Sequence, residues 1–228
     1  MGKKEEDEMK QVLAVVGDYY HNGELAKDAL NWALEPLIEE GEASVAYIGY
    51  EELPARLLER PDAVVMFKEN RLNPQESEPL YWMTEETAAS IASYVEKGGG
   101  WLVWHSGLAS YHFGEDQTYV NMLRGHFISH PELNQSVRYI GNTPDTDGSS
   151  EPIDFSIQDE HYFVECDTEN TDVFLRSESV DGESVAGWRH EFGAGRVICL
   201  TPAHKREGLL HPDVIGLLRS SVVWSFGS

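Results

Sequence analysis

Cysteine is scarce in this chain: Cys166 and Cys199 are the only two among 228 residues. Two cysteines cannot build the framework of several disulfides that staples small secreted domains. Cys199 lies in the apolar run Arg196-Val197-Ile198-Cys199-Leu200, which predicts a thiol packed inside the core. With 41% hydrophobic residues, the chain has enough apolar side chains for a sizeable core of its own.

Basic residues are also few, because 17 lysines and arginines stand against 40 acidic residues and give a net charge of −23. Such a surface repels nucleic acids and anionic membranes, so we expect neither as a partner. We interpret most of this acidity as a solvated surface that keeps the protein soluble.

Long apolar runs are absent as well. No stretch approaches the about 20 apolar residues that a membrane-spanning helix needs. Residues 1–10 are charged and lack the apolar segment of a signal peptide. We therefore expect a cytoplasmic protein with a disordered lead-in at residues 1–10 and a single domain over residues 11–228.

The first half of the chain alternates between apolar runs and amphipathic segments. The pattern predicts strands and helices in turn, at residues 12–17, 24–40, 44–48, 53–59, 62–67, 84–97 and 101–104. Strict alternation of this kind predicts an α/β fold with a mainly parallel sheet and helices on both faces.

The second half has a different pattern, with short strands separated by Gly, Pro, Asp and Ser. After a helical piece near 117–124, we expect strands at 135–140, 164–166, 173–175, 185–188 and 196–200, a polar loop at 141–151 and a closing helix at 213–225. No linker separates the two halves, so these strands are expected to extend the same sheet in mixed orientation.

The most informative segment is Gly98-Gly99-Gly100-Trp101-Leu102-Val103-Trp104-His105-Ser106-Gly107. It predicts a buried strand followed by a tight turn that carries His105 and Ser106. Open α/β sheets bind ligands beyond the carboxyl ends of their strands. The other polar residues expected at that rim are Asp18, Tyr19, Tyr20, His21, Lys68, Glu69, Asn70, His126, His130, Asp159, Glu160, His161 and His204.

Two chemistries suit converging His, Glu and Asp side chains. One is a divalent metal site, although no HExxH spacing is present. The other is acid–base chemistry on a sugar or polyol. Five aromatic residues would either stack on a sugar ring or pack in the core. They are Trp104, Tyr19, Tyr20, Tyr111 and Trp188.

A serine nucleophile is a third reading of the same turn. Ser106 would need His130 or His204 as its base, since adjacent side chains such as His105 diverge in a turn. The segment also lacks the first glycine of the G-x-S-x-G motif, which disfavours a nucleophilic serine.

Several of these residues, in this order, make the chain resemble the ThuA-like (trehalose utilisation) family, a branch of the class I glutamine amidotransferase-like fold. They are His21, Gly99-Gly100, His105-Ser106, Phe127, His130-Pro131, Asp159-Glu160, Tyr162, Trp188, Gly193-Ala194-Gly195-Arg196-Val197 and His204. The resemblance covers about residues 11–226. It implies a flavodoxin-like, three-layer sandwich.

The resemblance also implies where a pocket lies and what it lacks. Amidotransferases carry a nucleophilic cysteine in the turn that here holds His105-Ser106, so cysteine-dependent glutamine hydrolysis is not expected. Carried over to this chain, the pocket residues are His21, His105, His130, Asp159, Glu160 and His204. His126 and His161 are additional histidines, so the sequence leaves open which histidines face the pocket.

Our leading hypothesis is an enzyme of carbohydrate (trehalose or disaccharide) utilisation that acts on a small sugar. We assign catalysis to His105 and Glu160. Substrate binding is assigned to His21, Ser106, His130, Asp159 and His204, and a divalent metal such as zinc to His105, His130 and His204. The alternative is a non-catalytic protein that binds a sugar or metabolite, and a homo-oligomer is left open.

Overall fold

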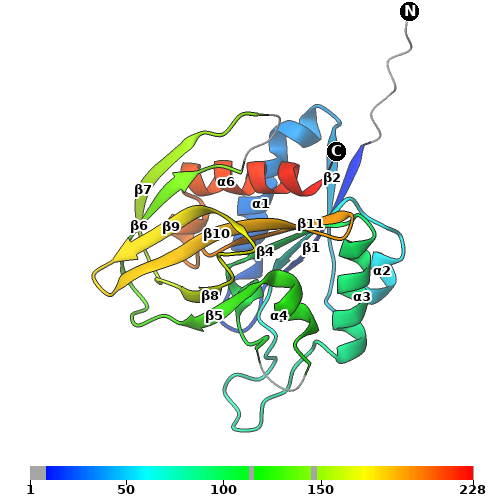
Figure 1. The fold of residues 1–228 in the computed structure, drawn as a ribbon, viewed down its shortest axis with the longest axis horizontal. Helices are drawn as coiled ribbons and strands as arrows, with labels where there is room; N and C mark the ends of the chain where they lie inside the picture. Colours follow the sequence, from blue (N-terminus) through cyan, green and yellow to red (C-terminus); the bar gives the residue numbers. More distant parts are fainter. Residues whose placement is uncertain (1–8, 113–115, 145–147, 228) are drawn as a thin grey trace, which may run out of the picture.

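The computed structural model describes residues 9–112, 116–144 and 148–227. Within these residues, one mixed sheet of nine strands has the order β2-β1-β3-β4-β11-β10-β9-β6-β7, with helices on both faces (Figure 1). The sequence predicted this α/β, three-layer, flavodoxin-like architecture, and the structure confirms it. Of the expected lead-in, residues 1–8 lie outside the described residues, whereas Lys10 already belongs to β1.

The parallel half of the sheet comes mostly from the first half of the chain. Its strands are β1 (Lys10–Val16), β2 (Ala43–Tyr47), β3 (Ala63–Phe67) and β4 (Gly100–Trp104). β11 (Gly195–Leu200) is the fifth and pairs parallel to β4. β3 and β4 are buried along their whole length, as expected of strands covered on both faces.

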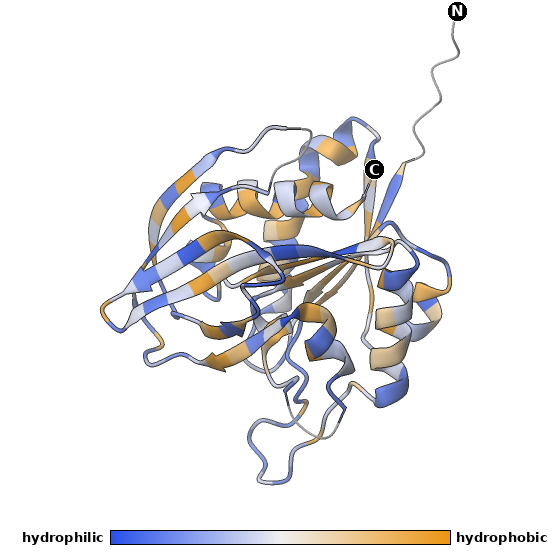
Figure 2. Cartoon of the chain, viewed as in Figure 1, coloured by the Kyte–Doolittle hydropathy of each residue, from blue (hydrophilic) through white to orange (hydrophobic). Residues whose placement is uncertain are grey.

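Helices cover this sheet on both faces and close two separate cores. α1 (Gly23–Glu39) and α6 (Pro212–Ser225) cover one face. α2 (Leu53–Leu57), α3 (Glu85–Glu96) and α4 (Thr118–Leu123) cover the other. Figure 2 shows apolar residues concentrated in the central strands and on the helix faces that meet them. Among the described residues, no helix is long and apolar enough to cross a membrane.

The antiparallel half comes from the second half of the chain. It contains β6 (Gln135–Asn142), β7 (Pro152–Asp159), β9 (Asp172–Ser179) and β10 (Gly182–Phe192). A separate two-stranded sheet is formed by β5 (Gly125–Ser129) and β8 (Phe163–Cys166). The sequence reading missed β5 and β7. In β7 only alternate residues are buried, so half of its side chains are polar and the segment lacks a continuous apolar run.

The turn that follows β4 places His105 at the rim of the sheet. A 3₁₀ helix, η1 (His105–Leu108), begins directly at the end of the strand. Gly107 packs so closely on β3 that a methyl group on its Cα would overlap the carbonyl oxygen of Met66. The short helix α5 (Arg206–Leu209) lies between β11 and α6.

Candidate functional site

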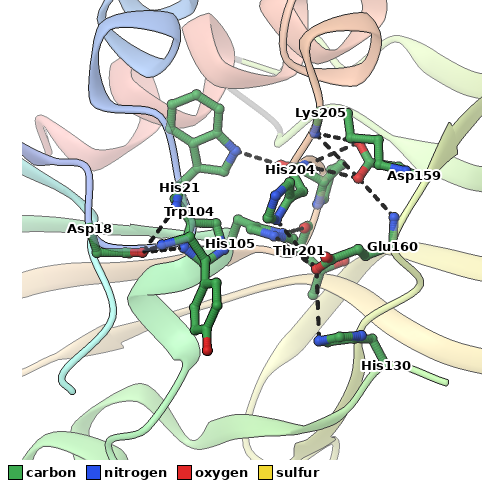
Figure 3. Close-up of polar contacts among 12 residues, drawn as sticks. Asp18, His21, Trp104, His105, His130, Asp159, Glu160, Thr201, His204 and Lys205 are labelled. Atoms are coloured by element: carbon green, nitrogen blue, oxygen red, sulfur yellow. Dashed lines mark hydrogen bonds and ion pairs between the residues drawn. The ribbon is translucent and has the colours of Figure 1, made fainter. Parts of the chain in front are cut away.

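A pocket of about 450 Å³ opens beyond the carboxyl ends of the parallel strands. Its lining comes from the ends of β1 and β3, from η1, from the β5 region, from the end of β7 and from the loop after β11. The lining residues are Tyr20, His21, Glu69, Ala109, Phe127, His130, Leu133, Glu160, Tyr162 and His204. Figure 3 shows the histidines and carboxylates of this rim side by side.

His105 lies beneath the pocket with no solvent exposure. Its backbone has the left-handed conformation (φ 45°), and its Nδ1 lies 2.6 Å from the carbonyl oxygen of Thr201. A carbonyl only accepts hydrogen bonds, so Nδ1 carries the proton and Nε2 has a free lone pair. Nε2 is buried without a hydrogen-bond partner. Burial, reinforced by His21 and His204, holds the pKa of His105 well below its ordinary value, so the ring is neutral.

His21 is oriented in the same way by a carboxylate. Its Nδ1 donates to Oδ1 of Asp18 at 2.5 Å, and its Nε2 is buried without a partner. Asp18 also accepts backbone N–H groups from Tyr20, His21 and Glu69. Burial by itself raises the pKa of Asp18, but the contacts with His21 and these amides outweigh it and leave the pKa lowered.

Glu160 lies among three histidines. Its Oε2 is 3.4 Å from Nδ1 of His204 and 3.9 Å from Nε2 of both His105 and His130. Burial opposes ionisation of Glu160, yet His204 and His130 outweigh it and lower its pKa. Burial likewise opposes protonation of His204, but its contacts with Glu160 and the charge of Asp159 raise its pKa. Glu160 is therefore held in its ionised form.

Asp159 and Ser106, both expected to bind substrate, are completely buried and do not line the pocket. The Asp159 carboxylate accepts the backbone N–H groups of Glu160, His204 and Lys205 at 2.7–3.3 Å. It thereby ties the end of β7 to the loop after β11 and fixes the positions of Glu160 and His204. The Ser106 hydroxyl is buried without a partner.

One group of histidines in the described chain has the spacing of a metal site. His21, His105 and His204 each offer a ligand atom, and these atoms lie within 4.8 Å of one another. The sequence had grouped His105 and His204 with His130 instead. His130 lies near Glu160, and its ring stacks toward Tyr162 with centroids 6.0 Å apart.

An aromatic wall lines one side of the pocket. The Tyr162 ring stacks on His105 with centroids 3.9 Å apart and contacts Phe127 at 4.4 Å. Tyr20 lines the pocket and is half-exposed at the rim. The sequence left open whether three other aromatic residues stack on a sugar ring or pack in the core. All three are buried in the core: Trp104, Tyr111 and Trp188.

Asp18, Glu69 and Tyr162 belong to the site although they were not among the residues assigned to it from sequence. Each had a signal, because Asp18 and Glu69 follow strands and Tyr162 is part of the family resemblance. The additional histidines lie elsewhere. His126 stacks on His112 at 3.9 Å, and His161 lies between the hydroxyls of Ser177 and Ser179.

The structure has relatives among solved proteins. A putative ThuA-like protein from Bacteroides uniformis shares the fold with a TM-score of 0.70 at 15% sequence identity, and the match covers 99% of this chain and 94% of that one. A putative ThuA-like protein from Parabacteroides merdae has a TM-score of 0.68 at 14% identity, and the match covers 96% of this chain and 90% of that one. A GH42 β-galactosidase from G. stearothermophilus matches 93% of this chain with 30% of its own length, at 14% sequence identity and a TM-score of 0.57. At these identities the likeness shows the fold alone.

Curated proteins give no match. A family model does match, however: the one described as ThuA, trehalose utilisation, fits residues 11–225. Because that match spans nearly the whole chain, this protein belongs to the ThuA trehalose-utilisation family.

Proposed function

We propose that this protein is an enzyme that acts on a small carbohydrate at the histidine pocket, with a divalent cation such as zinc held by His21, His105 and His204. The observation that carries this proposal is the convergence of three imidazoles on one point beside a carboxylate. The family description and the carbohydrate-acting name of the GH42 relative support a sugar as the substrate class.

The donor set fits a cation such as zinc. His21 and His105 each have one ring nitrogen bound to an oxygen atom and the other buried without a partner. Metal-ligating histidines are held by such second hydrogen bonds, to Asp18 and to the Thr201 carbonyl here. Tetrahedral zinc places its nitrogen ligands about 3.3 Å apart, so small side-chain rotations from the present spacing would complete the site.

A bound cation would act as a Lewis acid on an oxygen atom of the substrate. Glu160, which is ionised, would accept a proton from the substrate or from water. Tyr162 and Phe127 would pack against the face of the sugar ring. Cys166 and Cys199 are not among the pocket residues, which supports a route without a cysteine nucleophile.

The test combines metal analysis with turnover. We expect the purified protein to hold one equivalent of metal and to convert at least one member of a panel of neutral disaccharides that includes trehalose. His105→Asn tolerates the left-handed backbone and should lose both metal and turnover. His211→Asn, which keeps a capping side chain at the start of α6, serves as the control. A metal-free wild-type protein that binds sugars without converting them would favour the non-catalytic alternative.

A further inference from the structure

Glu69 is a second carboxyl group in the histidine pocket, supplied by a different strand from Glu160. It is the second residue after β3, lines the pocket and is only 8% exposed. Its neighbour Lys68 makes no close ion pair with it in the described structure, because the Lys68 ammonium lies over the Tyr50 ring, 5.0 Å from its centroid, and interacts with Glu69 only as a nearby charge. No lysine or arginine is among the residues that line this pocket in the described structure.

The Glu69 side chain is held by one oxygen only. The Ser110 hydroxyl donates to its Oε1 at 2.5 Å, from a backbone in the left-handed conformation (φ 64°). The Asp18 carboxylate fixes the Glu69 backbone by accepting its N–H at 2.8 Å. Across the described residues, Oε2 of Glu69 has neither a hydrogen bond nor an ion pair. One carboxyl oxygen is therefore anchored, and the other is left for a ligand.

The remaining pocket groups leave one chemical role unfilled. His21, His105 and His204 are the cation ligands of the proposed function, and Glu160 is ionised, so none of these four groups donates a proton. Acid–base chemistry on a sugar also needs a group that donates one. Glu69 has the opposite environment, because burial raises its pKa. The Ser110 hydrogen bond and the charges of His21 and Arg71 act against this rise, the Asp18 charge adds to it, and the pKa stays raised. Carboxyl pairs with divergent environments divide the acid and base roles in this way.

Resting on the proposed function, we propose that Glu69 is a further catalytic residue of this pocket, the acid that protonates a substrate oxygen while Glu160 accepts a proton. In that step the O–H bond of the Glu69 carboxyl breaks and a new O–H bond forms on the oxygen that develops negative charge. Glu69 is left as a carboxylate, and Glu160 gains the proton released by the substrate or by water. The total charge is unchanged, and exchange with solvent restores both groups.

A direct titration tests the acid without knowledge of the substrate. In protein labelled with ¹³C at the glutamate carboxyl carbons, the resonance that disappears in Glu69→Gln is that of Glu69. We expect its midpoint to lie above the ordinary glutamate value of about 4.3. Ser110→Ala should raise the midpoint further, because it removes a hydrogen bond to the ionised form. Glu86→Gln, an exposed change in the first turn of α3, should leave it unchanged.

Turnover supplies the second readout. Glu69→Gln should retain its metal and lower kcat by at least about 100-fold on whichever disaccharide the wild type converts. A midpoint at or below the ordinary value, or full turnover by Glu69→Gln, would overturn the assignment of Glu69. A wild-type protein without metal and without turnover would instead contradict the proposed function, and the titration would still report the state of Glu69.

Discussion

At the scale of single residues, hydrogen-bond partners decide what each pocket histidine can do. The Thr201 carbonyl and the Asp18 carboxylate each accept a hydrogen bond from Nδ1 of a histidine, which leaves Nε2 of His105 and of His21 to face a ligand. Sequence reasoning could place these histidines at strand ends. It could not assign their tautomers, because those depend on partners 96 and 3 residues away that only the fold brings into contact.

Asp18→Asn tests this orientation at His21. The substitution keeps the size of the side chain but removes its charge. It also replaces one carboxylate oxygen with an NH₂ group, which cannot accept the hydrogen bonds that His21 and the Glu69 backbone N–H donate in the wild type. We expect metal affinity to fall by about 10- to 100-fold. The affinity is measured by competition with a chromophoric chelator. The exposed Asp28→Asn on α1 is the control, and equal affinities for the two variants would contradict a role for Asp18.

At the scale of secondary structure, the strands predicted from continuous apolar runs are all present, whereas β5 and β7 were missed. The expected loop at 141–151 begins within β6, since Gly141 and Asn142 pair with β7. A strand at a sheet edge, in which buried and exposed residues alternate, has a weaker sequence signal than a parallel strand that is buried on both faces. This mattered for the site, because β7 ends at Asp159 and leads directly into Glu160.

Asp159 acts as a clamp between two elements, and its removal should cost stability. Asp159→Asn keeps one acceptor oxygen for the three backbone N–H donors. It replaces the other oxygen with an NH₂ group, which cannot accept their hydrogen bonds. We expect the free energy of unfolding in urea to fall by about 3 kcal/mol. Asp154→Asn on the same strand loses only an exposed ion pair with Arg138 and should leave the free energy of unfolding nearly unchanged. Similar losses for both variants would refute the clamp.

The packing of η1 on β3 makes a second prediction at this scale. Gly107→Ala would push a methyl group into the Met66 carbonyl and the Val103 side chain, so we expect a loss of about 1–3 kcal/mol. Gly216→Ala in α6 has open space around it and should instead stabilise the protein by about 0.5–1 kcal/mol. Thermal unfolding of the two variants compares them. An unchanged stability for Gly107→Ala would show that the turn carrying His105 can shift freely.

At the scale of the whole molecule, buried histidines link folding to pH. Burial lowers the pKa of His105, His126, His161 and His190. The unfolded chain therefore binds protons more readily than the folded one at these four positions. The contribution of these groups to the free energy of unfolding is fully present above the ordinary histidine pKa of about 6.5, and it is lost as the pH falls below that value. His204, whose pKa is raised, works in the opposite direction and offsets part of the loss.

His190 gives this linkage a magnitude that can be measured. Its Nε2 is 2.9 Å from the Met122 carbonyl, and burial, with the Arg124 charge, lowers its pKa to about 4. Between pH 7.5 and pH 5 this single group should remove about 2 kcal/mol of the free energy of unfolding. Urea titrations of EDTA-treated protein at the two pH values measure the loss. In His190→Asn the loss should shrink by that amount, whereas His211→Asn should keep it. An identical pH dependence in the wild type and His190→Asn would mean that His190 titrates alike in the folded and unfolded chains.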